Sequence, residues 1–177
     1  QMFYALLLDK DVPVTVTFSD VPADAWYAEA VNTLASLGMV EGYADGTFRP
    51  DNTITRAEFV TIAVGFADLE IDGEARFTDV ARNAWYYPYI ADACAYGWIG
   101  GYPDGSFRPD NTITRAEVTV IVNNMLGRAA DERYVDRHED ELRQFGDLTE
   151  AHWAWYPIAE AVNSHDYTGS GATERWR

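Results

Sequence analysis

FRPDNTITRAE occurs twice in this chain, at residues 48–58 and again at 107–117. Eleven identical consecutive residues in two places indicate an internal repeat. The similarity extends outward, because FSDVPADAWY at 18–27 aligns with FTDVARNAWY at 77–86, again 59 residues later. The chain is therefore built from tandem copies of one 59-residue unit.

A third copy begins as FGDLTEAHWAWY at 145–156, but no FRPDNTITRAE follows it. Its extra spacing falls in the charged stretch 128–144, and charge runs of this kind form solvated helices or linkers. Projected backward, the repeat places the first residues inside the second helix of an earlier copy, so we expect a piece of a longer array. The predicted segments are the tail of a preceding repeat at 1–17, repeats at 18–76 and 77–144 (the latter with the charged insert or linker 128–144), and a divergent or partial repeat at 145–177.

Each full repeat reads as helix, loop, helix. Apolar spacing predicts a first helix over 25–37 that stops at Gly38, and a counterpart that begins near Ala84 and stops at Gly97. Asp-Gly pairs then predict tight turns. A lone helix pair buries little surface, so neighbouring repeats must share a core. The fold class is mainly α with little or no β, and any strand is confined to 39–40 and 98–99.

Thr55 and Glu58 fit the capping box S/T-x-x-E, and Thr114 and Glu117 repeat it. Such a box stabilises a helix start by about 0.5–2 kcal/mol. This structural role accounts for the Thr and the Glu of each TRAE sequence.

Arg56 and Arg115 are not explained by capping. Each falls at the first helical position, where the helix dipole disfavours a cation. Three alternatives follow: a salt bridge to a carboxylate of a neighbouring repeat, a solvated side chain, or an anion site that combines the guanidinium with unpaired helix N–H groups.

The aromatic residues also allow two interpretations. Trp26, Trp85 and Trp153 are most simply core anchors of the first helices, but exposed rings beside polar donors would form a platform for a sugar face. Tyr43 and Tyr102, just before the Asp-Gly turns, are open to the same two interpretations.

Composition excludes several functions. A formal net charge of −16 disfavours nucleic acid and anionic membranes as partners. No apolar run is long enough for a membrane-spanning helix. The loop around Asp45 lacks the donor register of a calcium-binding EF-hand, and His138, His152 and His165 show no metal-ligand spacing. No carboxylate pair stands out for hydrolysis, so we predict neither an enzyme, nor a metal site, nor a cofactor.

Together, the F(S/T)DV and AWY sequences, the GY-x-DG turn and FRPDNTITRAE resemble the S-layer homology family. The resemblance covers nearly the whole chain. It implies a pseudo-threefold bundle of tandem modules with ligand grooves between them, outside the cell at the bacterial surface or wall. It also implies noncovalent anchoring to an anionic secondary cell-wall polysaccharide, often bearing pyruvate ketals. The alternative is a structural module that binds other surface-layer chains.

The resemblance favours the anion-site alternative for Arg56 and Arg115, because a pyruvate ketal carries one carboxylate on a sugar ring. At most two intact arginine-bearing sites are expected, since the third repeat lacks TRAE. Further residues that the resemblance assigns to the grooves are Trp26, Trp85, Asp20, Asp79, Gly42, Gly101, Tyr43 and Tyr102.

Overall fold

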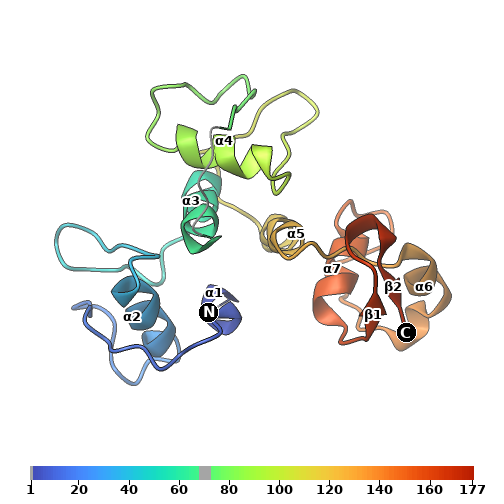
Figure 1. Ribbon diagram of the computed structural model, residues 1–177, viewed down its shortest axis with the longest axis horizontal. Helices are drawn as coiled ribbons and strands as arrows, with labels where there is room; N and C mark the ends of the chain where they lie inside the picture. Colours follow the sequence, from blue (N-terminus) through green and yellow to red (C-terminus); the bar gives the residue numbers. More distant parts are fainter. Residues whose placement is uncertain (1, 68–72) are drawn as a thin grey trace.

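The computed structural model in Figure 1 describes residues 2–67 and 73–177; residue 1 and residues 68–72, which belong to predicted repeats, lie outside the described part. Its helices and strands are α1 (Met2–Leu6), α2 (Ala28–Ser36), α3 (Arg56–Ala67), α4 (Tyr87–Ala95), α5 (Arg115–Met125), α6 (Glu132–Arg137), α7 (Trp155–Val162), β1 (Tyr167–Thr168) and β2 (Arg175–Trp176), with short 3-10 turns at Glu139–Glu141 and Gly171–Thr173. The prediction of a mainly α fold is confirmed.

The second helix of each repeat starts as predicted. Thr114 Oγ1 accepts the Glu117 N–H at 3.2 Å, and Glu117 Oε2 accepts the Thr114 N–H at 2.8 Å. Thr55 and Glu58 make the same reciprocal pair at 3.2 and 2.6 Å. Both TRAE sequences therefore form capping boxes, which fix where α3 and α5 begin.

The first helices end at the predicted glycines. Gly38 and Gly97 have φ of 72° and 71°, values that favour glycine. Met39 N–H reaches back to Leu34 O, and Trp98 N–H to Ala93 O, both at 2.9 Å, as in a Schellman motif. Both helices begin about one turn later than predicted, because residues 25–27 and 84–86 form turns rather than α-helix.

Helix α1 and the two full repeats share one core. Figure 1 shows α1, α3 and α5 end-on around the middle of the molecule, with α2, α4 and α7 outside them. The second helix of one repeat packs on the first helix of the next, so α3 contacts α4 and α5 contacts α7. Phe3 of α1, Val60 of α3 and Ile90 of α4 belong to the same buried cluster. The expectation of a core shared between repeats is therefore confirmed.

The strands expected at 39–40 and 98–99 do not form; both segments leave their helices as irregular backbone. In the described residues the sheet is instead the antiparallel pair β1–β2, in which Tyr167 lies opposite Trp176. The charged insert contains α6, whose Val135 is 0% exposed and packs in a second cluster with Trp155. None of the helices described has the length and apolar character needed to cross a membrane.

Candidate functional site

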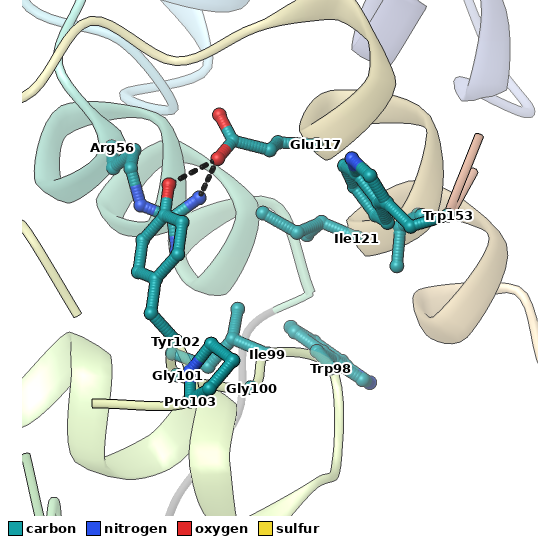
Figure 2. Close-up of a pocket in the computed structure, with 11 residues that line it drawn as sticks. Arg56, Trp98, Ile99, Gly100, Gly101, Tyr102, Pro103, Glu117, Ile121 and Trp153 are labelled. Atoms are coloured by element: carbon teal, nitrogen blue, oxygen red, sulfur yellow. Dashed lines mark hydrogen bonds and ion pairs between the residues drawn. The ribbon is translucent and has the colours of Figure 1, made fainter. Parts of the chain in front are cut away.

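Two grooves lie between consecutive repeats, and Figure 2 shows the one between the second and third repeats, here called groove 2. Its volume is about 480 Å³. Arg56 at the start of α3 forms one wall and Trp153, just before α7, forms another. The residues that line it are Arg56, Trp98, Ile99, Gly100, Gly101, Tyr102, Pro103, Glu117, Val120, Ile121 and Trp153.

Groove 1, of about 340 Å³, occupies the equivalent place between the first and second repeats. Tyr43 and Glu58 line it where Tyr102 and Glu117 line groove 2, and Trp85 takes the place of Trp153. Its lining residues are Val40, Glu41, Gly42, Tyr43, Phe48, Arg49, Pro50, Asn52, Thr53, Ile54, Glu58, Thr61, Ile62 and Trp85. The internal repeat therefore produces a repeated cavity.

Arg56 is 5% exposed and forms the salt bridge that the sequence left as one alternative. Its Nη1 lies 2.9 Å from Glu117 Oε1, and its Nε donates to Phe107 O at 2.9 Å. Both partners belong to the second repeat, so Arg56 joins the first repeat to the second and at the same time lines groove 2. A role of Arg56 in ligand binding stays a prediction.

The helix start around Arg56 is also occupied. Arg56 N–H donates to Asn111 O at 2.9 Å, and Ala57 N–H donates to Pro109 O at 3.0 Å. The second FRPDN loop therefore satisfies the N–H groups that the anion-site alternative requires at α3. Any anion bound by Arg56 has to approach from the groove.

Glu117 is fixed from several sides. Tyr102 donates its hydroxyl proton to Glu117 Oε1 at 2.5 Å. Burial raises the pKa of Glu117, but hydrogen bonds from the Thr114 N–H and the Tyr102 hydroxyl, together with Arg56, outweigh it and lower that pKa overall. Burial, and donation to Glu117, raise the pKa of Tyr102. The wall of groove 2 is thus an ionised pair with a neutral phenol beside it.

Arg115 has a different environment, although its local sequence is identical. Its side chain is exposed and has no ion pair with any described residue. The N–H groups of Arg115 and Ala116 likewise find no acceptor within the described residues, whereas at α3 the loop of the next repeat supplies the acceptors. The solvated alternative describes Arg115 in this structure, and its assignment to a ligand site stays a prediction.

Asp20 and Asp79 hold the loops that shape the grooves. Asp20 accepts the Phe48 and Arg49 N–H groups at 2.8 and 2.7 Å, and Asp79 accepts the equivalent pair at 2.8 and 2.8 Å. The N–H donors of Phe48 and Arg49 lower the pKa of Asp20. Neither aspartate lines a groove. These two predicted site residues instead hold the backbone of the loops next to the grooves.

Gly42 and Gly101 line grooves 1 and 2, and at each of them the backbone lies close to a phenylalanine ring and a loop carbonyl. A Cβ on Gly101 would lie 2.6 Å from the Phe77 ring and 2.8 Å from Ser106 O. No described residue accepts a hydrogen bond from the N–H groups of residues 99–101, which are part of the wall of groove 2. These glycines therefore keep the backbone close to the cavity.

The tryptophans are not core anchors, so that interpretation is wrong. Trp26, Trp85 and Trp153 are 78%, 59% and 62% exposed, because the turn before each first helix directs them away from the shared core. Trp85 and Trp153 form groove walls, whereas Trp26 lines neither groove. The sugar-platform alternative fits the exposure of all three.

Tyr43 and Tyr102 each carry a stacked arginine. The guanidinium carbons of Arg49 and Arg108 lie 3.9 Å above their ring centres. Each arginine also pairs with the Asp of its Asp-Gly turn at 2.9 Å. One face of each tyrosine is therefore covered by its own loop, and the rest of the ring lines a groove.

Sequence reasoning missed a buried charge cluster in the third repeat. His165 lies between Glu160 and Glu174, and these three residues place possible metal-ligand atoms within 4.8 Å of one another. Arg128 Nη2 lies 2.6, 3.0 and 2.9 Å from Glu160 Oε1, Glu174 Oε1 and His165 Nε2. The positively charged guanidinium of Arg128 therefore already lies where a metal ion bound by these three residues would lie. No local motif links residue 128 to residue 174, so spacing could not reveal the cluster.

Comparison with known proteins gives the same family. The model of the S-layer homology domain matches residues 17–60 and 76–119. A cellulosome-anchoring protein of Acetivibrio thermocellus is 35% identical over 159 residues, which cover 86% of this chain and 34% of that protein. A surface-layer 125 kDa protein of Lysinibacillus sphaericus is 33% identical over 172 residues, covering 95% and 14%.

Each matched segment contains one complete FRPDNTITRAE and the aspartate, Asp20 or Asp79, that accepts the loop N–H groups. Each segment also contributes a wall to a groove. The chain spans about a third or less of the length of these relatives. It belongs to the S-layer homology family and is an anchoring module of the bacterial cell surface and wall.

Proposed function

We propose that this chain attaches its parent protein noncovalently to an anionic, pyruvylated secondary cell-wall polysaccharide. The observation that carries the proposal is groove 2, where the exposed indole of Trp153 stands across a cavity from the ion-paired guanidinium of Arg56 (Figure 2). An apolar ring face opposite a fixed charge suits a sugar that bears one acidic substituent.

The sugar ring would stack on Trp153. This indole is 62% exposed, and Trp98, Val120 and Ile121 extend the apolar wall beneath it. The apolar face of a pyranose binds to such a wall, while its hydroxyls require polar partners at the edges of the cavity. The N–H groups of residues 99–101, which no described residue accepts, are suitable donors.

The carboxylate of the pyruvate ketal would approach the Arg56 end of the groove. Glu117 already neutralises Arg56, so the acidic group adds to a network rather than to a bare cation. Attraction is then local and short-ranged, which fits a chain of net charge −16 and predicts weaker binding at high salt. Arg115, which is exposed, would contact the polymer outside the grooves.

Retention on purified cell-wall sacculi tests this function. Wild-type protein should sediment with untreated sacculi and lose most of that binding after chemical removal of pyruvate. Trp153→Ala should abolish binding through groove 2, while Trp26→Ala, at a tryptophan that is also exposed but lines neither groove, serves as the control. Undiminished binding after pyruvate removal would contradict the assignment of the acidic sugar.

The second candidate function is assembly with other surface-layer chains, and one observation favours it. The start of α3 is covered by the loop 107–113, whereas the same TRA sequence at α5 has no partner among the described residues. A FRPDNTITRAE segment of another chain has the two loop carbonyls and the glutamate carboxylate that the start of α3 already contacts, and it could supply them to the start of α5. Self-association that depends on protein concentration, and that Arg115→Glu reduces, would support this candidate; a monomer at all concentrations would exclude it.

A further inference from the structure

Groove 2 does not end at Val120, because this side chain also lines a second cavity of about 150 Å³, here called the α5–α7 pocket. The α5 residues that line groove 2 are Glu117, Val120 and Ile121. Those that line the pocket are Val120, Asn123 and Asn124, about one turn further along the helix. Side chains three and four residues apart lie on one face of a helix. The pocket therefore continues groove 2 along the same face of α5.

The opposite wall continues in the same direction. Trp153, just before α7, lines groove 2, while Tyr156 and Pro157 in the first turn of α7 line the pocket. Asn123 Nδ2 donates to Pro157 O at 2.9 Å, so a hydrogen bond joins the two walls. The helices α5 and α7 therefore border one continuous channel, with groove 2 at one end and the pocket at the other.

Two polar groups in the pocket have unused hydrogen-bonding capacity. Asn123 is 7% exposed, and no described residue donates a hydrogen bond to its Oδ1. Arg128 donates through Nε and Nη2, but its Nη1 has no acceptor among residues 2–67 and 73–177. An acceptor and a donor in one small cavity suit hydroxyl groups, which both accept and donate.

The charges around the pocket do not favour an anion. Arg128 Nη2 lies 2.6 Å from Glu160 Oε1 and 3.0 Å from Glu174 Oε1, so two carboxylates offset one guanidinium. Glu132, which is exposed, adds a further carboxylate to the lining. A second acidic group would meet like charge here, whereas a neutral ring would not. The pocket therefore suits an uncharged sugar.

The polar side chains of the pocket distinguish α5 from α3. The residues 59 positions before Asn123 and Asn124 are Val64 and Gly65. Val64 is 5% exposed and packs in the shared core, and a glycine offers no side chain. The repeat thus does not account for the two asparagines.

We infer that the α5–α7 pocket is a second subsite, which binds the uncharged sugar next to the acidic ring held in groove 2. This rests on the proposed function, because it takes groove 2 as the site of that ring. Asn123 Oδ1 accepts a hydrogen bond from a sugar hydroxyl, and Arg128 Nη1 donates to one. The channel then binds two consecutive units of the polysaccharide rather than a single ring.

Calorimetric titration with fragments of the purified wall polysaccharide tests the subsite. The fragments contain one or two sugar rings, and both keep the pyruvate ketal. The two-ring fragment should bind roughly tenfold more tightly, because it makes the additional hydrogen bonds. In NMR spectra of the labelled chain, the side-chain amide signal of Asn123 should shift with the two-ring fragment and stay in place with the one-ring fragment.

Two variants test the pocket itself. Ala129→Phe fills it from a residue that lines the pocket but not groove 2. Asn123→Val installs the residue type that the first repeat has at this position. Each variant should remove most of the tenfold difference, and an unchanged affinity for the one-ring fragment shows that groove 2 is intact. Arg133→Ala, exposed on α6 and lining neither cavity, is the control.

The outcomes separate the subsite from the function on which it rests. Equal affinity of the wild-type chain for the two fragments, or a difference that survives both Ala129→Phe and Asn123→Val, would overturn the subsite while the proposed function stands. If neither fragment binds, the saccharide function and the subsite both fail.

Discussion

The segments 48–58 and 107–117 have one sequence and two environments. Arg56 is 5% exposed and Phe107 is 0% exposed, whereas Arg115 is exposed and Phe48 is only half-buried. The difference arises because the loop of the second segment covers the helix start of the first, while no loop among the described residues covers the helix start of the second. Contacts within a repeat are therefore duplicated, while contacts between repeats depend on the neighbour.

The largest expected effect comes from the two arginines. Arg56→Ala should lower the free energy of unfolding by about 3–5 kcal/mol, because it leaves Glu117 without the partner of a buried ion pair. Arg115→Ala should change it by no more than about 0.5 kcal/mol. Urea unfolding of both variants checks this, and equal losses would show that the two segments are equivalent after all.

The two phenylalanines should differ in the same direction. Phe107→Ala removes a fully buried ring that also contacts Arg56, and it should cost about 3–5 kcal/mol of stability. Phe48→Ala should cost less, because part of the ring is already in contact with water. Thermal unfolding compares the two; a larger loss for Phe48 would contradict the burial difference.

The groove glycines should behave alike, since their tight contacts lie within a repeat. A Cβ on Gly42 or on Gly101 would overlap the ring of Phe18 or Phe77 and a loop carbonyl. Each Gly→Ala variant should therefore lose about 1–3 kcal/mol. Gly100→Ala, whose Cβ meets nothing within 4 Å, is the control. A loss at only one of Gly42 and Gly101 would break the rule that contacts within a repeat are duplicated.

The smallest effect is a pH dependence of the junction between the repeats. The pKa of Glu117 is lowered in the folded chain, so its contribution to stability is complete above the unfolded pKa and is lost as pH falls through the folded value. Stability should thus decline as pH falls below about 4.5. Glu117→Gln should flatten that decline in urea titrations, and an unchanged decline would assign it to other carboxylates.

Local sequence predicted the parts of the fold that local contacts determine. The capping boxes at Thr55 and Thr114 and the helix stops at Gly38 and Gly97 formed as expected, because each depends on residues within one turn. The mainly α fold and the shared core followed from the same helix spacing and the repeat.

Contacts between residues far apart in the chain could not be predicted from the sequence. Nothing in TRAE distinguishes Arg56 from Arg115, because the salt bridge depends on a loop more than fifty residues away. The apolar spacing of the first helices wrongly suggested buried tryptophans. Trp85 precedes its helix, and its side chain is exposed rather than part of the core. The cluster around Arg128 joins residues up to 46 positions apart.

A crystal structure with a pyruvylated wall saccharide bound would locate the acidic sugar on the chain. We expect the sugar ring on Trp153 in groove 2, with its carboxylate at the Arg56 end of the cavity. A saccharide whose carboxylate meets Arg115, with groove 2 empty, would contradict that expectation.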